Sequence, residues 1–335
     1  MNPTRRQYLH FGMGLGVLSA FPALSVMAGN TAVQEAASRI VWRERSLTGF
    51  GTTLWLRIGD PSADKADVAL DRSVQLLRQI ESQMSLFDEH SAVSRLNRSG
   101  ELRKPSRELL DVIDLSSRIS AGSGGAFDIT MQPLWLMWTR AQAESRLPTA
   151  KERDAARALV NWRALSADAQ RIVLPKGRLL SLNGIAQGFA ADALRAQMQS
   201  AGIRHAMLDT GETAVLGSAP GGLPWRFGIE NVHLKETTPA QSAVVPDGYA
   251  MATSSDAHTT FTVDRVHHHI LDPRTADSPG WWSSVSVIAK SATLADGLTK
   301  VFFMLPPQQV QQAVRQWNVS VILQDKQGRW RRFSA

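Results

Sequence analysis

The chain has 335 residues, enough for one large domain or two modest ones with a substantial core. It contains no cysteine, which excludes disulfides, thiolate metal sites and a thiol nucleophile. The formal net charge is +7, from 37 Lys and Arg against 30 Asp and Glu, and the basic residues are scattered. This distribution argues against nucleic-acid binding and favours a solvated surface, although a mild positive bias would suit an anionic substrate.

The N-terminus has the pattern of a removable export signal. Residues 4–9 read Thr-Arg-Arg-Gln-Tyr-Leu, a twin-arginine motif, and an apolar, glycine-rich run follows over residues 11–27. This run is short for a stable membrane span, which needs about 20 apolar residues; a membrane anchor or a buried helix is the alternative. We therefore predict a signal peptide over 1–28, a mature domain over 29–335 without a membrane span, and a periplasmic location reached by the twin-arginine route.

Hydrophobic periodicity predicts helices and many short strands along the mature chain. The predicted helices are residues 63–83, 107–121, 151–159, 185–200, 292–304 and 307–317. The predicted strands are 40–47, 52–58, short segments near 164, 172 and 180, then 206–208, 214–216, 225–229, 248–253, 259–263, 284–288, 319–323 and 330–333. Residues 217–223 and 233–247 read as surface loops. Because strands and helices do not alternate strictly, we predict an α+β fold with antiparallel sheets and packed helices, in two intimately packed sub-domains.

Small residues open the predicted helix 185–200, in the sequence Asn183-Gly184-Ile185-Ala186-Gln187-Gly188. Unpaired N–H groups at a helix start favour phosphate, and glycine lets a phosphate approach the backbone closely. The alternative is a helix start whose glycines serve only tight packing. Taken alone, the motif does not decide between a phosphate site and packing.

Two further groups of residues could carry chemistry. Asp296 and Lys300 lie one turn apart on the predicted helix 292–304, where the simplest interpretation is an i, i+4 ion pair. In the run His267-His268-His269, an imidazole could accept a proton from a hydroxyl, whereas a zinc site lacks an obvious third ligand. The turn Asp272-Pro273-Arg274-Thr275 after this run is typical of local side-chain hydrogen bonds.

Five blocks in order resemble the ApbE-type FAD:protein FMN transferases. They are MSLFDEHSAVSRLN (84–97), GGAFDITMQPLWLMW (124–138), LNGIAQGFAAD (182–192), HHHILDPRT (267–275) and SATLADGLTKVFFML (291–305). The resemblance implies an ApbE-like, T-fold-like architecture with FAD in a cleft between the sub-domains. It implies Mg²⁺ held by the Ala186 carbonyl, Asp296 and Thr299, with His269 and Asp296 as catalytic residues. It also implies flavin contacts from Phe50, Phe87, Ala126, Phe127, Asp128, Asn183, Gly184, Gln187, Phe189, Thr253, Ser254, Ile270 and Lys300.

Several polar positions depart from the family pattern. Lys300 stands where the family usually has a threonine metal ligand, and Thr299 lies one residue earlier. Gln187 replaces a common lysine, and Ser181 replaces an aspartate. A lysine ammonium only donates hydrogen bonds and cannot ligate Mg²⁺. Either Thr299 reaches the ion, or Lys300 meets the pyrophosphate directly.

The resemblance implies that a Thr or Ser hydroxyl of an acceptor flavoprotein domain, in an exported or membrane redox complex, attacks FAD with release of AMP. Accessory flavinylation proteins of the nitrous-oxide-reductase system share the twin-arginine signal and the ApbE body. The departures leave a non-catalytic FAD-binding or FAD-delivering protein open. An FAD pyrophosphatase and an exported oxidoreductase using FAD are further alternatives.

Overall fold

The structure is a computed structural model that describes residues 40–233, 241–257 and 259–335. The predicted signal peptide, residues 1–28, lies outside these described residues. Within the described ranges, no helix has both the length and the apolar character that a membrane crossing requires. The cleavage and the periplasmic location stay predictions.

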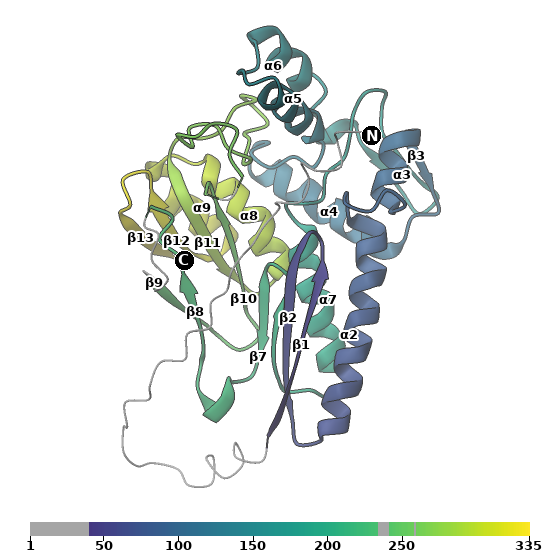
Figure 1. Ribbon diagram of the computed structural model, residues 1–335, viewed down its shortest axis with the longest axis vertical. Helices are drawn as coiled ribbons and strands as arrows, with labels where there is room; N and C mark the ends of the chain where they lie inside the picture. Colours follow the sequence, from purple (N-terminus) through teal and green to yellow (C-terminus); the bar gives the residue numbers. More distant parts are fainter. Residues whose placement is uncertain (1–39, 234–240, 258) are drawn as a thin grey trace.

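An antiparallel sheet of eight strands organises the molecule, in the order β1-β2-β6-β7-β10-β11-β12-β13 (Figure 1). Alternation of buried apolar and more exposed residues marks most of β2, where Leu54, Leu56 and Ile58 are fully buried, whereas β10, β11 and β12 are buried along most of their length. The strands are β1 (Val41–Gly49), β2 (Thr52–Asp60), β6 (His205–Asp209), β7 (Thr213–Leu216), β10 (Ala250–Ser255), β11 (Trp282–Ala289), β12 (Ser320–Asp325) and β13 (Trp330–Ser334).

The sheet consists of two halves with a short seam between them. β7 pairs with β10 only at Ala214↔Ala250 and Thr213↔Met251, whereas every other neighbouring pair in the sheet has a longer ladder. Beyond Met251, β10 continues without β7 as a neighbour. This seam leaves backbone and side chains of both halves facing a common space.

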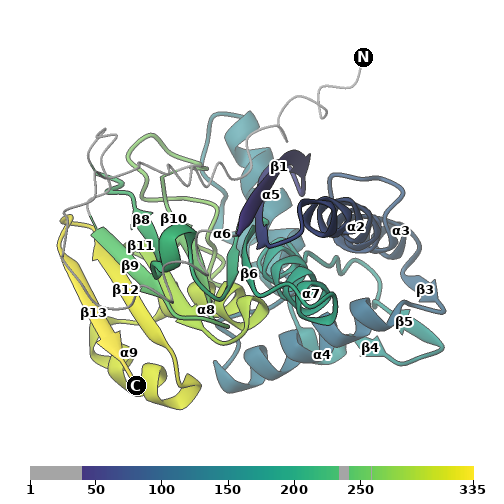
Figure 2. The same cartoon turned by 90° about the horizontal axis from the view of Figure 1, so that it is seen from below.

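Three helices cover one face of the sheet and lie side by side (Figure 2). They are α2 (Ala63–Met84), α7 (Ala186–Ser200) and α8 (Ala292–Met304). On the opposite face, the hairpin of β8 (Trp225–Ile229) and β9 (Gln241–Val245) buries Trp225 and Val245 against Met207 and Met251 of the sheet. The sheet is therefore enclosed on both faces at the seam.

Smaller elements complete the described part of the chain. Figure 1 shows α5 and α6 beyond one end of the sheet, and α3 packs against α2 and β3. These elements are α3 (Ala92–Ser99), β3 (Glu101–Arg103), α4 (Arg107–Gly122), α5 (Gln132–Ala143), α6 (Ala150–Arg157), η2 (Trp162–Ala164), β4 (Ser166–Ala167), β5 (Arg171–Val173), η3 (Pro220–Gly222) and α9 (Pro307–Trp317).

The predicted α+β class with antiparallel sheets is confirmed, and several local elements differ from the prediction. Helices α3 and α5 were not predicted, and β9 lies inside the segment predicted as a loop. No strand forms over 259–263, because Thr262 and Asp264 hydrogen-bond to each other and to nearby backbone and draw the chain into turns. The apolar residues of α5 surround the helix without clear periodicity, so the pattern gave no helix signal there.

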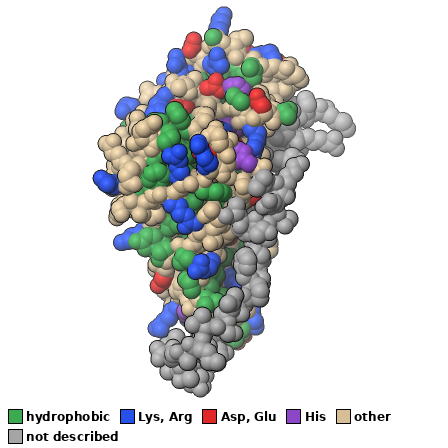
Figure 3. Space-filling model, turned by 90° about the vertical axis from the view of Figure 1, so that its left-hand side faces the viewer, with side chains coloured by type: hydrophobic (Ala, Val, Ile, Leu, Met, Phe, Trp, Pro, Cys, Tyr) green, Lys and Arg blue, Asp and Glu red, His purple; other side chains and the backbone are tan. Residues whose placement is uncertain are grey.

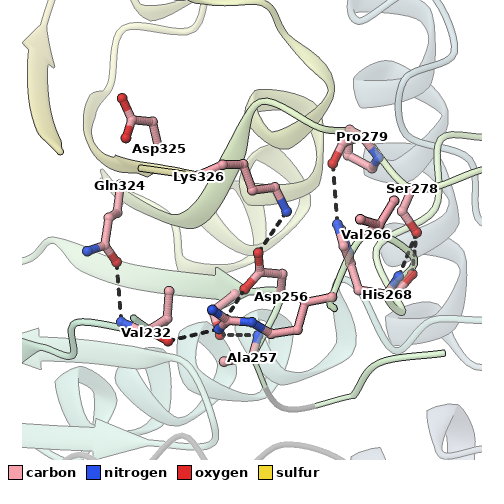
Figure 4. Close-up of polar contacts among 12 residues, drawn as sticks. Val232, Asp256, Ala257, Val266, His268, Ser278, Pro279, Gln324, Asp325 and Lys326 are labelled. Carbon is pink, nitrogen blue, oxygen red and sulfur yellow. Dashed lines mark hydrogen bonds and ion pairs between the residues drawn. The ribbon is translucent and has the colours of Figure 1, made fainter. Parts of the chain in front are cut away.

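Buried charges anchor the irregular segment 259–281, which carries the run His267-His268-His269. Asp256 is 1% exposed and pairs with Lys326, at 2.7 Å, and with Arg265, at 3.5 Å (Figure 4). His268 is fully buried, and its Nδ1 has no hydrogen-bond partner among the described residues. Burial, with the neighbouring Lys326 charge, lowers the pKa of His268 to about 3.

This histidine gives a prediction for stability against pH. Its folded pKa of about 3 lies below the ordinary value of 6.5, so the unfolded chain binds the proton more readily. The stabilising contribution is complete above pH about 6.5 and is lost as the pH falls toward 3. Between these limits, the free energy of unfolding should fall more steeply for the wild type than for His268→Gln, by up to about 1.4 kcal/mol per pH unit. Urea unfolding of both proteins over this range measures the difference; parallel curves would contradict it.

Candidate functional site

A cavity of about 450 Å³ opens at the seam of the two half-sheets. This volume falls within the roughly 300–1,000 Å³ typical of small-molecule sites. Most of the predicted site residues line it, although they come from six separate segments of the chain. Those in the wall are Phe87, Ala126, Phe127, Asp128, Asn183, Gly184, Gln187, Thr253, Ser254, His269, Ile270 and Lys300.

The N-terminus of α7 forms one part of the cavity wall, through Asn183, Gly184 and Gln187. Its N-cap residue, Ile185, provides no side-chain hydrogen bond to the first turn. In the first turn, the Ala186 N–H donates to the Leu182 carbonyl at 2.8 Å and the Gly188 N–H donates to the Asp296 carboxylate at 3.1 Å. The positive end of the helix dipole still favours an anion at this end. The segment expected to bind phosphate thus borders the cavity.

Close packing of α7 on α8 sets the position of this helix start. A Cβ on Gly188 would lie 2.4 Å from the Ala292 carbonyl oxygen, so only glycine fits at this crossing. Asp192 of α7 accepts hydrogen bonds from the Ala292 and Thr293 N–H groups, both at 2.9 Å, at the start of α8. The carboxylate therefore caps the neighbouring helix and fixes the register of α7 against α8.

Asp296 is buried between the two helices, and both of its carboxylate oxygens are already bonded. One oxygen accepts the Gly188 N–H at 3.1 Å, and the other pairs with the Lys300 ammonium. Lys300 also donates to the Asp296 carbonyl, at 3.2 Å. The simple ion-pair interpretation of Asp296 and Lys300 is therefore confirmed, but the pair is buried and Lys300 reaches the cavity.

The oxygen atoms of Ala186, Asp296 and Thr299 that were expected to ligate Mg²⁺ do not form a metal site in this arrangement. The Thr299 hydroxyl donates to the Asp296 carbonyl at 2.7 Å and shares a hydrogen bond with Ser254 at 2.8 Å. Asp296, Thr299 and Ala186 are not in the cavity wall. Mg²⁺ needs oxygen ligands, and the cation beside Asp296 is instead the Lys300 ammonium. Over the described ranges, no group of three or more His, Asp and Glu side chains could hold a metal.

His269 is the histidine that faces the cavity. Its Nδ1 lies 3.0 Å from the Thr259 carbonyl oxygen, which can only accept, so Nδ1 carries the proton. In the neutral ring, Nε2 is then the acceptor nitrogen. His267 instead pairs with Asp277 at 2.7 Å and stacks on Trp138, away from the cavity wall. The geometry thus separates one proton acceptor from two structural histidines.

Asp128 lines the cavity, but its carboxylate oxygens accept hydrogen bonds from neighbouring residues of the protein. One oxygen accepts from the N–H and the hydroxyl of Thr130, and the other accepts the Trp162 N–H at 3.0 Å. Burial is the main effect on its pKa, which is raised. Asp128 therefore shapes the loop that presents Ala126 and Phe127 to the cavity.

Two aromatic residues expected to contact flavin lie elsewhere. Phe50 is 7% exposed in the main core, at the turn between β1 and β2, where its N–H donates to Glu81. Phe189 packs against the same core from α7. Neither is in the cavity wall, because each is directed into the helix–sheet interface. Of the aromatic side chains proposed for stacking on flavin, Phe87 reaches the cavity.

Three carboxyl groups in the wall, those of Asp209, Glu212 and Glu230, were not predicted as site residues. Glu212 is buried at the end of β7 and accepts the Thr253 N–H at 2.9 Å, replacing the missing strand partner of β10. Burial and, next, the neighbouring Asp296 raise its pKa well above the ordinary value. Burial also raises the pKa of Asp209 to about 6. Local sequence patterns did not reveal Asp209 and Glu212 as site residues, because their contacts depend on the seam between the half-sheets.

The described fold and cavity define an α+β protein with a small-molecule site between two half-sheets. Residues 50–323 match the sequence profile of the ApbE family. The chain therefore belongs to the ApbE family. It is 33% identical over 233 residues to a FAD:protein FMN transferase of Vibrio cholerae serotype O1, covering 67% of this chain and 69% of that protein. It is 30% identical over 290 residues to one of Klebsiella pneumoniae, covering 82% of each.

Solved structures agree with this assignment. The apo form of the flavinyl transferase ApbE of Pseudomonas stutzeri superimposes with a TM-score of 0.74 at 26% identity, over 88% of this chain and 95% of that one. An ApbE protein of Thermotoga maritima gives a TM-score of 0.77 at 24% identity, over 88% and 97%, and supports the fold alone.

Proposed function

We propose that this chain transfers the FMN part of FAD to a Thr or Ser hydroxyl of an acceptor flavoprotein, with AMP as the leaving group. The observation that carries the proposal is a single cavity wall that holds the α7 N-terminus, Lys300 and a histidine with an acceptor nitrogen. The family and the relatives' names support FAD as the substrate. The predicted export signal favours an acceptor in an exported or membrane redox complex.

Each group in the wall has a role in this reaction. The start of α7 and Lys300 would bind the pyrophosphate, and Phe87 and Phe127 would contact the rings. The acceptor hydroxyl oxygen forms a bond to the FMN-side phosphorus, while the bond from that phosphorus to the bridging oxygen breaks and AMP leaves. The hydroxyl proton passes to Nε2 of His269. Catalysis of this kind depends on positioning and on neutralising phosphate charge.

Magnesium is implied by the resemblance at Ala186, Asp296 and Thr299. The Asp296 carboxylate and the Thr299 hydroxyl already form hydrogen bonds within the protein. We therefore assign no step of the reaction to a metal ion. The hydroxyl activation and the binding of pyrophosphate rest on the chain's own residues.

The test is incubation of the mature chain with FAD and a candidate acceptor domain that carries a Thr or Ser target. We expect a mass increase of the acceptor equal to FMN less one water, together with AMP in equal amount. We also expect tighter binding of FAD than of riboflavin, because riboflavin lacks the pyrophosphate that the α7 start would contact. AMP and free FMN without acceptor labelling would indicate a pyrophosphatase, and FAD binding without either product would indicate a delivery protein.

A further inference from the structure

We propose that the Lys300 ammonium is a built-in cation for the FAD pyrophosphate, so that FAD binding by this chain needs no divalent metal ion. The inference rests on the proposed function, since it takes FAD as the ligand. It concerns the residue at which this sequence and the expected metal site differ most.

The position of Lys300 places its charge at the phosphate-binding end of the cavity. Its Cε would lie 3.3 Å from a Cβ built on Gly184, so its side chain passes directly over the residue before the α7 start. Lys300 and Gly184 both line the cavity. A phosphate at the helix start would therefore meet the ammonium and the positive end of the α7 dipole together.

The hydrogen bonds of the ammonium hold it in place and leave it capacity for a ligand. An ammonium has three donors. The Asp296 carboxylate and the Asp296 carbonyl each accept one, which leaves capacity for a phosphate oxygen. The side chain is 22% exposed and its partner only 1%, so the pair is largely desolvated yet open toward the cavity. Asp296 acts here as a positioning residue for Lys300.

The same contacts oppose a divalent ion at this place. Gly188 and Lys300 occupy both oxygens of Asp296, and Ser254 and the Asp296 carbonyl engage the Thr299 hydroxyl. Asp296 is the only negatively charged ligand among the three residues expected to hold Mg²⁺. An ammonium in contact with it would repel Mg²⁺ at short range. A fixed lysine is thus a replacement for the metal rather than an addition to it.

The experiment measures FAD affinity by quenching of flavin fluorescence, in excess EDTA and in excess MgCl₂. For the wild type, the dissociation constant should be the same in both. Lys300→Ala should weaken binding about 10- to 150-fold in both, which corresponds to one lost charge-assisted hydrogen bond of about 1.5–3 kcal/mol. Lys300→Thr should weaken binding in EDTA, and MgCl₂ should restore part of the loss.

Lys326→Ala is the matched control. Lys326 also pairs with a buried aspartate, Asp256, and its side chain is 23% exposed with a partner at 1% (Figure 4). It is not in the cavity wall, so this variant should lose stability but keep FAD affinity. Equal losses of affinity in both alanine variants would reduce the Lys300 effect to general destabilisation and overturn the proposal.

The proposal would also be overturned if FAD binding by the wild type disappeared in EDTA and returned with MgCl₂, and if Lys300→Ala left the affinity unchanged. Failure to label any acceptor, with metal-independent FAD binding intact, would count against the proposed transfer but not against the role of Lys300. Absence of FAD binding in every condition would contradict both the proposed transfer and the role of Lys300.

Discussion

His269→Ala should reduce the rate of FMN transfer by about 10²–10⁴, the range for loss of a general base. The Nδ1 bond to the Thr259 carbonyl makes Nε2 the acceptor nitrogen on a residue of the cavity wall. FAD affinity should change little, because the pyrophosphate is assigned to the α7 start and Lys300. Single-turnover labelling of an acceptor domain and a parallel FAD titration measure the two effects separately.

His267→Ala is the control for this variant. It removes a histidine two positions away that pairs with Asp277 and stacks on Trp138 outside the cavity wall. We expect a loss of stability with transfer per folded molecule retained. Transfer by His269→Ala at the wild-type rate would show that another group accepts the proton.

Asp296→Ala should lower the free energy of unfolding by about 3–5 kcal/mol, the usual result of removing one partner of a buried ion pair. The change leaves the Lys300 ammonium without its carboxylate and the buried Gly188 N–H without its acceptor. Because Lys300 is 22% exposed toward the cavity, water can partly hydrate it, and we expect the lower part of that range. Urea unfolding monitored by circular dichroism measures the change.

Asp296→Asn separates shape from charge at the same site. It keeps the volume of the side chain and one oxygen acceptor, so its cost should lie between those of the wild type and Asp296→Ala. Equal stability of all three proteins would show that the pair between α7 and α8 contributes nothing measurable. In that case, the packing of Gly188 on Ala292 alone would fix the two helices.

The sequence predicted the elements with strong periodicity and clear end signals. The helices 63–83, 292–304 and 307–317 agree with α2, α8 and α9 within one residue, because their apolar stripes and flanking residues are local features. The strand predicted over 259–263 does not form. Its alternating apolar residues favour a strand, but side-chain hydrogen bonds of Thr262 and Asp264 stabilise turns instead. The strand β9 was not predicted, because it forms by pairing with β8 and sequence periodicity does not reveal pairing between separate segments.

For the site, the sequence by itself determined the kinds of group that are present: a helix start rich in small residues, a histidine run, and an aspartate and lysine one turn apart. Only the tertiary structure decided which of them meet. It selects His269 from three neighbouring histidines, moves Phe50 and Phe189 into the core, and brings Glu212 to β10 at the seam. It also brings the Gly188 N–H to the Asp296 oxygen that does not pair with Lys300. The Glu212 and Gly188 contacts join residues 41 and 108 positions apart, and local patterns do not encode such contacts.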